Sequence, residues 1–273
     1  MNKTLIPWVK NPDGSQGYTW NPITGCLNHV NGLCKGGGFP CYAYRLATTR
    51  LKERYLENPN VASPFTKRFE PIYHEDPFYP RFWPERLYHP WSSEPRGIFP
   101  CDMSDLFGIG IPEEWTRDVL NLCRLHSENR YYLLTKQPQN LPRWSPFPDN
   151  CWVGVTATNE ETMQKVIYFD DIWAKVRFIS FEPLLGRLSK VSLYNIRQNL
   201  ADWLIIGAQT KPYKPPRIEW VDEIVEAADK ADVPVFLKEN LKPLLKDDPT
   251  ATWAFNIDPD YAMRLRQEMP SAR

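Results

Sequence analysis

Residues Trp152–Asn159 read WVGVTATN, and this short stretch decides the fold. The run Trp152–Thr156 is apolar almost throughout and has the length of a strand that is buried on both faces. Asn159, a residue type favoured at helix N-caps, then begins a predicted helix over Asn159–Tyr168. A buried strand that leads directly into a helix is the repeating unit of α/β proteins.

The same pattern recurs on both sides of this stretch. Six other runs are predicted to be strands: Tyr18–Gly25, Gly97–Met103, Tyr131–Thr135, Val176–Phe181, Trp203–Gly207 and Val233–Leu237. Helical patterns lie between several of them: Tyr42 to about Tyr55, Pro112–His126 and Glu219–Lys230. Strands that alternate with helices predict an α/β fold with a parallel sheet, and six or seven repeats predict a partial (β/α) TIM-like barrel.

The chain is predicted to form a single domain over residues 1–273, because a length of 273 residues with 42% hydrophobic side chains can bury one substantial core. The barrel is expected over 18–240. Residues 64–96 are rich in proline and aromatic residues without a clean periodicity, which predicts an ordered loop insert. Residues 241–273 are predicted to be a C-terminal extension.

Composition argues against two classes of protein. No run approaches the roughly 18 uninterrupted apolar residues that a membrane span requires, and no apolar run follows the first residues as it would in a signal peptide. We therefore expect a cytoplasmic protein without a membrane partner. The 33 basic and 33 acidic residues balance, so whole-chain charge does not favour nucleic-acid binding.

Three of the six cysteines lie close together, in the spacing Cys26-x7-Cys34-x6-Cys41. Clustered thiols without a secretory signal favour metal binding over disulfides. The glycines of this loop, Gly32 and Gly36–Gly38, let a backbone wrap closely around a compact group. The spacing predicts a metal site. Nothing in the sequence assigns a role to the three remaining thiols, which are Cys101, Cys123 and Cys151.

Two metals suit this loop. His29 would complete a tetrahedral zinc site with the three cysteines. An iron–sulfur cluster held by only three cysteines would leave one iron open for a cofactor such as S-adenosylmethionine. The spacing alone leaves both open, and the position of the loop after the first strand, beside polar strand ends, favours iron.

Polar residues follow the ends of six predicted strands, where barrels of this kind carry their chemistry. An acid or a lysine there costs several kcal/mol if it is buried without a partner. For any one of them, loop entry or helix capping is the commoner role, but together they indicate the rim of a ligand pocket. The set comprises Asp102, Ser104, Asp105, Thr135, Lys136, Thr156, Thr158, Glu182, Gln209, Thr210, Lys238 and Glu239.

At these residues the chain resembles a phage-associated family of three-cysteine proteins of unknown function, whose members look like relatives of radical S-adenosylmethionine enzymes. Eight collinear stretches within about residues 18–240 carry the resemblance: TWNPITGC (Thr19–Cys26), CYAYRLATTR (Cys41–Arg50), DMSDLF (Asp102–Phe107), LLTKQPQNL (Leu133–Leu141), WVGVTATN (Trp152–Asn159), RFISFEPLLG (Arg177–Gly186), WLIIGAQT (Trp203–Thr210) and VPVFLKEN (Val233–Asn240).

The resemblance implies a partial (β/α) barrel with a [4Fe–4S] cluster on Cys26, Cys34 and Cys41, and it supplies no reaction. The sequence departs from the family pattern twice. Six residues separate the last two cysteines, where such families usually have about two, and Phe39 and Tyr42 are both candidates for the aromatic residue beside the cofactor. The segment Gly207–Thr210 reads GAQT where Gly-Gly-Glu-Ser is common, so a carboxylate is missing at Gln209.

These observations predict a radical S-adenosylmethionine-type enzyme that starts hydrogen abstraction from a substrate and takes electrons from a reductant such as flavodoxin or ferredoxin. The alternative is a zinc-stapled nucleic-acid- or partner-binding protein without catalysis. The predicted cofactor-binding residues are Phe39, Tyr42, Asp102, Ser104, Thr156 and Gln209. The predicted catalytic residues are Glu182, Lys136 and Lys238.

The leading interpretation for the substrate is a nucleic acid or a nucleobase derivative. Residues 64–96 interleave aromatic side chains with lysines and arginines, a mixture that stacks on nucleobases and contacts phosphates. The basic residues are Lys67, Arg68, Arg81, Arg86 and Arg96. Five acids offset them, namely Glu70, Glu75, Asp76, Glu85 and Glu94, and aromatic packing over the barrel is the commoner outcome for such a segment.

Overall fold

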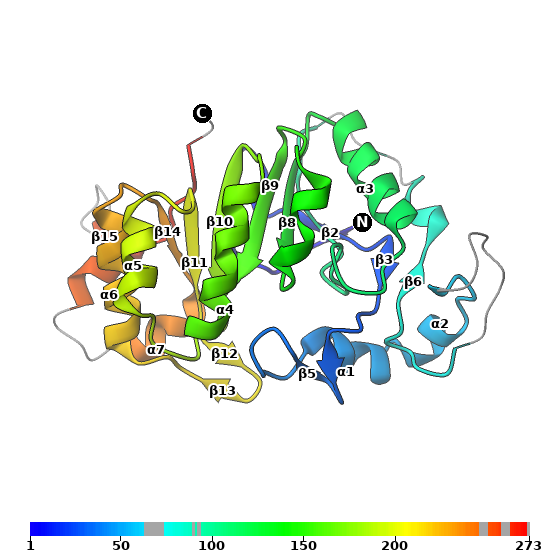
Figure 1. Ribbon diagram of the computed structural model, residues 1–273, viewed down its shortest axis with the longest axis horizontal. Helices are drawn as coiled ribbons and strands as arrows, with labels where there is room; N and C mark the ends of the chain where they lie inside the picture. The colour runs from blue at the N-terminus through cyan, green and yellow to red at the C-terminus, as the bar shows by residue number, and fades with distance from the viewer. Residues whose placement is uncertain (63–73, 89–90, 92–93, 246–250, 258–262, 272–273) are drawn as a thin grey trace. The chain divides into compact units, whose positions relative to one another are not determined.

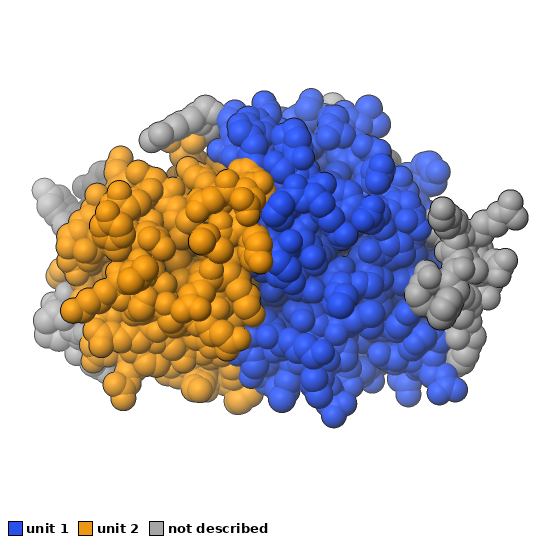
Figure 2. Space-filling view, viewed as in Figure 1, with its two compact units in different colours: residues 1–153, 173–175 blue, residues 154–172, 176–273 orange. Residues whose placement is uncertain are grey.

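The computed structural model describes residues 1–62, 74–88, 91, 94–245, 251–257 and 263–271 (Figure 1). The chain divides into two compact units, which Figure 2 shows in different colours. Unit 1 comprises Met1–Val153 and Trp173–Lys175, and unit 2 comprises Gly154–Ile172 and Val176–Arg273.

The largest element is an eight-stranded, mostly parallel sheet in the order β1-β2-β7-β8-β9-β10-β11-β14. Its strands are β1 (Asn2–Lys3), β2 (Tyr18–Trp20), β7 (Gly97–Pro100), β8 (Arg130–Thr135), β9 (Cys151–Thr156), β10 (Val176–Phe181), β11 (Trp203–Ile206) and β14 (Val235–Leu237). Strand β1 pairs antiparallel with β2, whereas β2–β7, β7–β8, β10–β11 and β11–β14 pair in parallel. All seven predicted strands contribute to it, which confirms the mixed α/β fold.

Burial explains why these strands lack an alternating pattern. All six residues of β9 and all four of β11 are buried, as expected for strands covered on both faces. Position 154 in β9 has no space for a side chain, because a Cβ on Gly154 would lie 2.2 Å from the ring of Phe178 in β10. Glycine is therefore required for the two strands to approach.

The predicted first strand, Tyr18–Gly25, is wrong in its second half. The chain leaves β2 after Trp20, and β3 (Ile23–Thr24) pairs antiparallel with β6 (Arg81–Phe82) in a separate small sheet. Pro22 lies at the break, and its missing N–H cannot continue a strand ladder. The described part of the predicted insert therefore pairs, through β6, with the segment that precedes the cysteine loop.

Two predicted helices are confirmed and two are modified. The structure has α3 (Glu113–Leu125) and α6 (Ile218–Asp229) close to their predicted bounds. The helix expected after Asn159 is short: α4 (Glu160–Gln164) begins with a capping box between Asn159 and Thr162 and continues as the 3-10 helix η4 (Lys165–Asp171). A further helix, α5 (Lys190–Arg197), was not predicted.

The single helix predicted from Tyr42 to about Tyr55 is instead two, α1 (Tyr42–Thr48) and α2 (Lys52–Leu56). The Thr48 hydroxyl donates to the Tyr44 carbonyl at 2.9 Å, and the Thr49 hydroxyl donates to Arg45 at 2.6 Å. Hydroxyls that bond the preceding turn compete with the helical ladder, which accounts for the interruption.

The remaining elements are short. They are the strand pairs β4 (His29–Val30) with β5 (Leu33–Cys34), β12 (Gln209–Thr210) with β13 (Tyr213–Lys214) and β15 (Phe255–Ile257) with β16 (Met263–Leu265), the helix α7 (Lys242–Leu245), and the 3-10 helices η1 (Pro84–Arg86), η2 (Pro138–Asn140), η3 (Pro142–Trp144), η5 (Glu239–Leu241) and η6 (Ala251–Ala254). In the C-terminal extension, the Arg266 carbonyl accepts a hydrogen bond from Leu237 N, so this segment covers the free edge of β14. Within the described ranges, no helix has the length and apolar character to cross a membrane.

Candidate functional site

The cysteine loop of unit 1 folds back on itself. In the β4–β5 hairpin His29 stands opposite Cys34, and the backbone N–H of Cys41 donates to the Gly32 carbonyl at 2.8 Å. Gly32 has a positive φ of 82°, and a Cβ there would lie 2.5 Å from the ring of Tyr44. The turn between the first two cysteines therefore requires a glycine, which fixes how the loop lies on α1.

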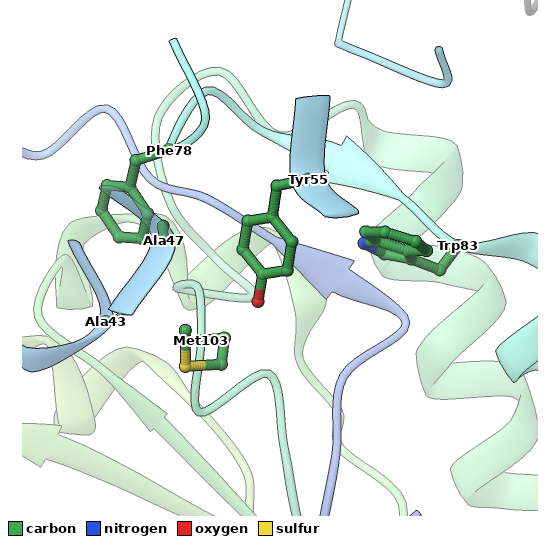
Figure 3. Packing of buried hydrophobic residues seen from close by; sticks show 6 residues of the cluster. All are labelled: Ala43, Ala47, Tyr55, Phe78, Trp83 and Met103. Carbon is green, nitrogen blue, oxygen red and sulfur yellow. The ribbon is translucent and has the colours of Figure 1, made fainter. Parts of the chain in front are cut away.

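Six buried hydrophobic residues form a cluster against which part of the cysteine loop packs, and Figure 3 shows these six side chains. Its buried members come from α1, α2, the described part of the insert and the loop after β7: Ala43, Ala47, Tyr55, Phe78, Trp83 and Met103. Cys26 and Cys41 pack against this cluster. Two of the three thiols are thus positioned by one shared core.

The loop after β7 fastens the start of the cysteine loop. Gly25 N donates to the Met103 carbonyl at 2.9 Å, and the Ser104 hydroxyl donates to the Gly25 carbonyl. Cys26 N donates to the Phe78 carbonyl at 2.9 Å. Ser104, a predicted cofactor-binding residue, therefore has an internal partner immediately before Cys26.

Asp102 also has internal partners. Its carboxylate accepts hydrogen bonds from the Asn21 amide and, at 3.3 Å, from the Tyr42 hydroxyl, which in addition donates to the Asp102 carbonyl. Burial raises the pKa of Asp102, whereas the hydrogen bonds from Asn21 and Tyr42 act in the opposite direction. Tyr42 remains 48% exposed. The first residue of α1 is thus attached to the loop after β7.

Asp105 organises the end of β8. Its carboxylate accepts hydrogen bonds from the Thr135 hydroxyl at 2.8 Å, from Lys136 N at 3.0 Å and from Phe107 N at 3.1 Å. Asp105 is only 6% exposed, and these three donors satisfy it. The carboxylate thereby sets the direction in which Lys136 leaves the strand.

Lys136 lies across the cysteine loop. A Cβ on Gly36 would lie 2.8 Å from the Lys136 Cβ, and the Lys136 Nζ is 6.0 Å from the centre of the Phe39 ring. Burial raises the pKa of Cys34, and the charge of Lys136 opposes that rise. The structure therefore brings the predicted residues Lys136 and Phe39 to the second cysteine.

The three thiols share one loop and differ in burial: Cys34 is buried, and Cys26 and Cys41 are partly buried. Burial raises the pKa of Cys26 to about 12, and the negative charges of Asp105, Cys34 and Cys41 add to this rise. Even so, among the residues that the structure describes, no group of three or more His, Cys, Asp or Glu side chains has the arrangement of a metal site. In its chemistry, a set of three thiols in a glycine-rich loop fits an iron–sulfur cluster. The loop would have to close for all three to ligate it.

His29 already has a role in the hairpin. Its Nδ1 accepts a hydrogen bond from Gly32 N at 3.3 Å, and its ring packs 4.9 Å from that of Tyr44 and 5.3 Å from that of Phe78. These contacts leave Nε2 as the ring nitrogen not used in the turn. His29 stands beside Cys34, so the structure keeps it as a candidate zinc ligand.

Unit 2 brings together the ends of β10, β11 and β14. Glu182, directly after β10, forms an ion pair with Lys238, directly after β14. Gly207 at the end of β11 lies beneath this pair, because a Cβ there would come within 2.8 Å of the Lys238 side chain. Two predicted catalytic residues are therefore partners of each other.

Asn240 is a positioning residue that the sequence reasoning missed. Its amide accepts a hydrogen bond from Ala208 N at 3.1 Å and donates to the Ala208 carbonyl at 2.8 Å. The Asn240 carbonyl accepts from the Tyr213 hydroxyl at 3.0 Å. Gln209, which follows Ala208 in the chain, donates a hydrogen bond from its side-chain amide to the Pro212 carbonyl at 2.9 Å. The place of Asn240 two residues after Lys238, at the end of the VPVFLKEN stretch, was the available signal.

Thr156 differs from the other predicted residues because its hydroxyl is left without a partner. It is 3% exposed, and Ser180 in β10 is 1% exposed; neither hydroxyl has a hydrogen-bond partner within the described part of the chain. Leaving a buried hydroxyl unsatisfied costs about 1–3 kcal/mol. Such groups in native proteins call for a water molecule or a ligand, and Ser180 had no signal in its apolar sequence context.

Comparison with known proteins places the chain in a family. Residues 3–243 match the model of a family described as "Protein of unknown function (DUF5131)". The chain belongs to this family. The matched region includes the cysteine loop and every strand end described above. No curated protein and no solved structure matches the chain.

The insert of this DUF5131 chain uses its described arginines internally. Arg81 is fully buried and donates to the carbonyls of His74, Asp76 and Tyr79. The guanidinium of Arg86 lies 3.9 Å from the centre of the Trp83 ring, and that of Arg96 lies 4.8 Å from the Tyr18 ring. These contacts serve packing, the commoner outcome for such a segment. Lys67, Arg68 and Glu70 lie outside the described residues.

The predicted site residues of the DUF5131 chain divide between the two units. Unit 1 contains Cys26, Cys34, Cys41, Phe39, Tyr42, Asp102, Ser104 and Lys136. Unit 2 contains Thr156, Glu182, Gln209 and Lys238. Within unit 1, Asp102 and Ser104 fasten the loop, and Lys136 crosses it. Within unit 2, Glu182 and Lys238 pair, and Gln209 begins the β12–β13 hairpin.

Proposed function

We propose that this DUF5131 chain is an iron–sulfur enzyme of the radical S-adenosylmethionine type, with a [4Fe–4S] cluster on Cys26, Cys34 and Cys41. One observation carries the proposal: three thiols occupy a single glycine-rich loop, whose start the loop after β7 fastens through Gly25. A cluster held by three cysteines keeps one iron open for the cofactor. The resemblance seen in the sequence supports the same assignment.

The loop is open on the side of Gly38. Gly38 has a positive φ of 70°, and a Cβ built there would meet no atom within 4 Å. Gly36 is buried under Lys136, so the loop has one closed side and one open side. Closure on a cluster requires the thiols to lose their protons, and burial makes this costly for Cys26 in the absence of a metal.

The surrounding residues have distinct parts in this proposal. The cluster with S-adenosylmethionine supplies homolytic hydrogen abstraction from a substrate. Lys136 partly offsets the negative charge that builds up on the thiolates, and Asp105 holds its backbone in place. Tyr42 and Phe39 flank the loop as the aromatic candidates beside the cofactor. Asp102 and Ser104 act by positioning the loop.

The remaining expectations belong to the same proposal. The mostly parallel sheet would be a partial (β/α) barrel, and the chain would work in the cytoplasm with flavodoxin or ferredoxin as reductant. Thr156, Gln209, Glu182 and Lys238 would contact cofactor or substrate groups. The unsatisfied hydroxyl of Thr156 is the observation that supports a ligand contact in this set.

A zinc-stapled binding protein without catalysis is the second candidate. The observation in its favour is that His29 lies opposite Cys34 in the β4–β5 hairpin, since opposite residues of an antiparallel pair project to the same side. With Cys26 and Cys41, these two would complete a tetrahedral zinc site.

Anaerobic reconstitution separates the two candidates. The iron–sulfur proposal predicts about four irons per chain and a broad absorbance near about 400 nm, both lost in Cys26→Ala, Cys34→Ala and Cys41→Ala. Cys123→Ala removes a buried thiol from α3, outside the loop, and should keep the iron. Stoichiometric zinc that survives anaerobic purification and is lost in His29→Ala would replace the proposal with the zinc staple.

A further inference from the structure

Residues 209–217, which comprise the hairpin β12–β13 and the three residues after it, concentrate positive charge in unit 2. Figure 1 shows the backbone of this hairpin. Residues 209–217 read QTKPYKPPR and contain Lys211, Lys214 and Arg217 without any acid. Residues 210–215 are all exposed, as is Arg217. Because the whole chain has a net charge of zero, three cations in nine residues are a local concentration and not a general property.

These cations have no carboxylate partner among the described residues, and the guanidinium of Arg217 lies 5.9 Å from the centre of the Trp220 ring. Neither Lys211, Lys214 nor Arg217 forms an ion pair with a residue that the structure describes. Nearby bases behave differently: Lys242 pairs with Glu239, and Arg187 pairs with Glu223. Gln209 stands at the base of the hairpin, directly opposite Lys214, so a neutral amide and no carboxylate adjoins the cations.

The hairpin also presents one aromatic ring in a fixed place. Tyr213 is 48% exposed, and its hydroxyl is held by the Asn240 carbonyl at 3.0 Å. The Gln209 amide donates to the Pro212 carbonyl at 2.9 Å and ties the tip of the hairpin to its base. Prolines at 212, 215 and 216 restrict the backbone further. A partner would therefore lose little of its binding energy to ordering this surface.

An exposed aromatic ring among unpaired cations suits one chemical class of partner. Single-stranded nucleic acid supplies phosphates for the cations and bases that stack on the ring. A membrane surface would favour several apolar side chains beside the cations, and residues 209–217 offer only Tyr213 as an aromatic anchor. An acidic peptide would use the charges but would not require the ring.

We propose that residues 209–217 bind single-stranded nucleic acid, and that this polymer is the substrate class of the enzyme; the second part rests on the proposed function. The position within unit 2 supports it. The hairpin follows β11 directly, and Asn240 binds both Ala208 and Tyr213 just after Lys238. A single-stranded nucleic acid bound on the hairpin would therefore lie next to the Glu182–Lys238 pair.

Fluorescence anisotropy with a labelled single-stranded oligonucleotide of about 16 nucleotides, as DNA and as RNA, tests the proposal on the full chain. Three phosphate contacts predict a slope of about −2 in a plot of log affinity against log salt. Binding should therefore weaken roughly 15-fold between about 50 and 200 mM salt. Absence of binding at the lower salt concentration would overturn the proposal.

Variants assign the binding to the hairpin. The double variant Lys211→Gln/Lys214→Gln removes two of three contacts, so the salt slope should fall to about −0.7. The matched control Lys165→Gln/Lys230→Gln removes the same charge from two exposed lysines of unit 2 and should bind like the wild type. If both double variants lose affinity equally, the binding is not located on the hairpin and the proposal is wrong.

Two substitutions of Tyr213 test stacking. Tyr213→Phe loses the hydrogen bond to Asn240 but keeps the ring, and it should retain most of the affinity. Tyr213→Leu should bind roughly fivefold or more weakly, because stacking on the ring is lost. Equal affinities in these two variants contradict base stacking.

Competition with polyglutamate tests whether the hairpin recognises negative charge alone. Polyglutamate that competes as well as nucleic acid would assign the hairpin to acidic proteins and overturn the proposal.

Binding and iron content are independent readings. Cys26→Ala should bind the oligonucleotide like the wild type, because Cys26 belongs to unit 1 and the hairpin to unit 2. Binding without iron in the wild type would refute the proposed function and leave the nucleic-acid surface standing. Iron without binding would refute the surface alone.

Discussion

Glu182 and Lys238 form an ion pair that joins the end of β10 to the end of β14. The two side chains are 26% and 13% exposed, so the pair is largely withdrawn from water. Burial lowers the pKa of Lys238 from 10.5 to about 8, whereas the carboxylate of Glu182 favours the charged amine. The pair holds two strand ends of unit 2 together, and burial of Lys238 brings the pKa of its amine toward neutral pH.

The amine of Lys238 should react at unusually low pH. Acylation by an amine-reactive reagent, followed residue by residue with mass spectrometry, should rise with a midpoint near pH 8. An ordinary lysine titrates near about pH 10.4. Glu182→Gln should move the midpoint lower still, because the charged amine loses its partner. A midpoint at the ordinary value would mean that the ion pair outweighs burial.

The same amine should make stability depend on pH in the alkaline range. Its pKa is lower in the folded chain than in the unfolded one, so between pH 8 and 10.5 the unfolded chain binds more protons. The free energy of unfolding contributed by this group therefore rises with pH across that window. Urea unfolding of the wild type and of Lys238→Met at about pH 7.5 and about pH 10, near the two ends of this window, would isolate the contribution of Lys238. Equal pH dependence in both proteins contradicts the assignment.

Removing one charge of the Glu182–Lys238 pair should lower the free energy of unfolding more than removing both charges. Glu182→Gln leaves a buried amine without its carboxylate and should lower the free energy of unfolding by about 1–3 kcal/mol, discounted for partial exposure. Glu182→Gln/Lys238→Met replaces both charges and should recover much of that loss. A double-mutant cycle from urea unfolding measures the coupling, and additive losses would show that the two residues do not interact.

Gly154 is expected to reject any side chain. Gly154→Ala places a Cβ against the Phe178 ring, so we expect a loss of about 1–3 kcal/mol in thermal or urea unfolding. Gly154→Ala/Phe178→Leu removes the obstructing ring edge and should cost less than the two single variants combined. Strict additivity would contradict the contact.

The cysteine loop should become resistant to proteolysis when it holds a cluster. Lys35 is exposed between the second and third cysteines, so trypsin should cut after it in the metal-free chain. Reconstitution should suppress this cut, and Cys41→Ala should be cut under both conditions. Mass spectrometry of the fragments gives the measure. Cleavage that is unaffected by iron in the wild type would show that the loop does not close on a metal.

Some departures from the predicted elements have local causes. Pro22 ends β2 early, and the hydroxyls of Thr48 and Thr49 interrupt the predicted helix. Others have no local signal. Arg81 resembles a solvent-facing base in the sequence, yet it is buried because the carbonyls of three residues of the same insert converge on its guanidinium. A single basic residue does not reveal whether its charge will face a ligand or the chain's own backbone.

By itself, the sequence determined seven of the eight strands of the large sheet and the polar residues at the ends of six of them, because strands buried on both faces are apolar along most of their length and stop where polar groups begin. The exposed strand β1 (Asn2–Lys3) has no such signal. It also determined the cysteine loop as a set of thiols. Only the tertiary structure decided which polar groups are already paired. Asp102 meets Asn21 and Tyr42 across 81 and 60 residues of chain, and Lys238 meets Glu182 across 56. Hydrogen bonds and ion pairs depend on distance in space, and the folded chain alone sets that distance.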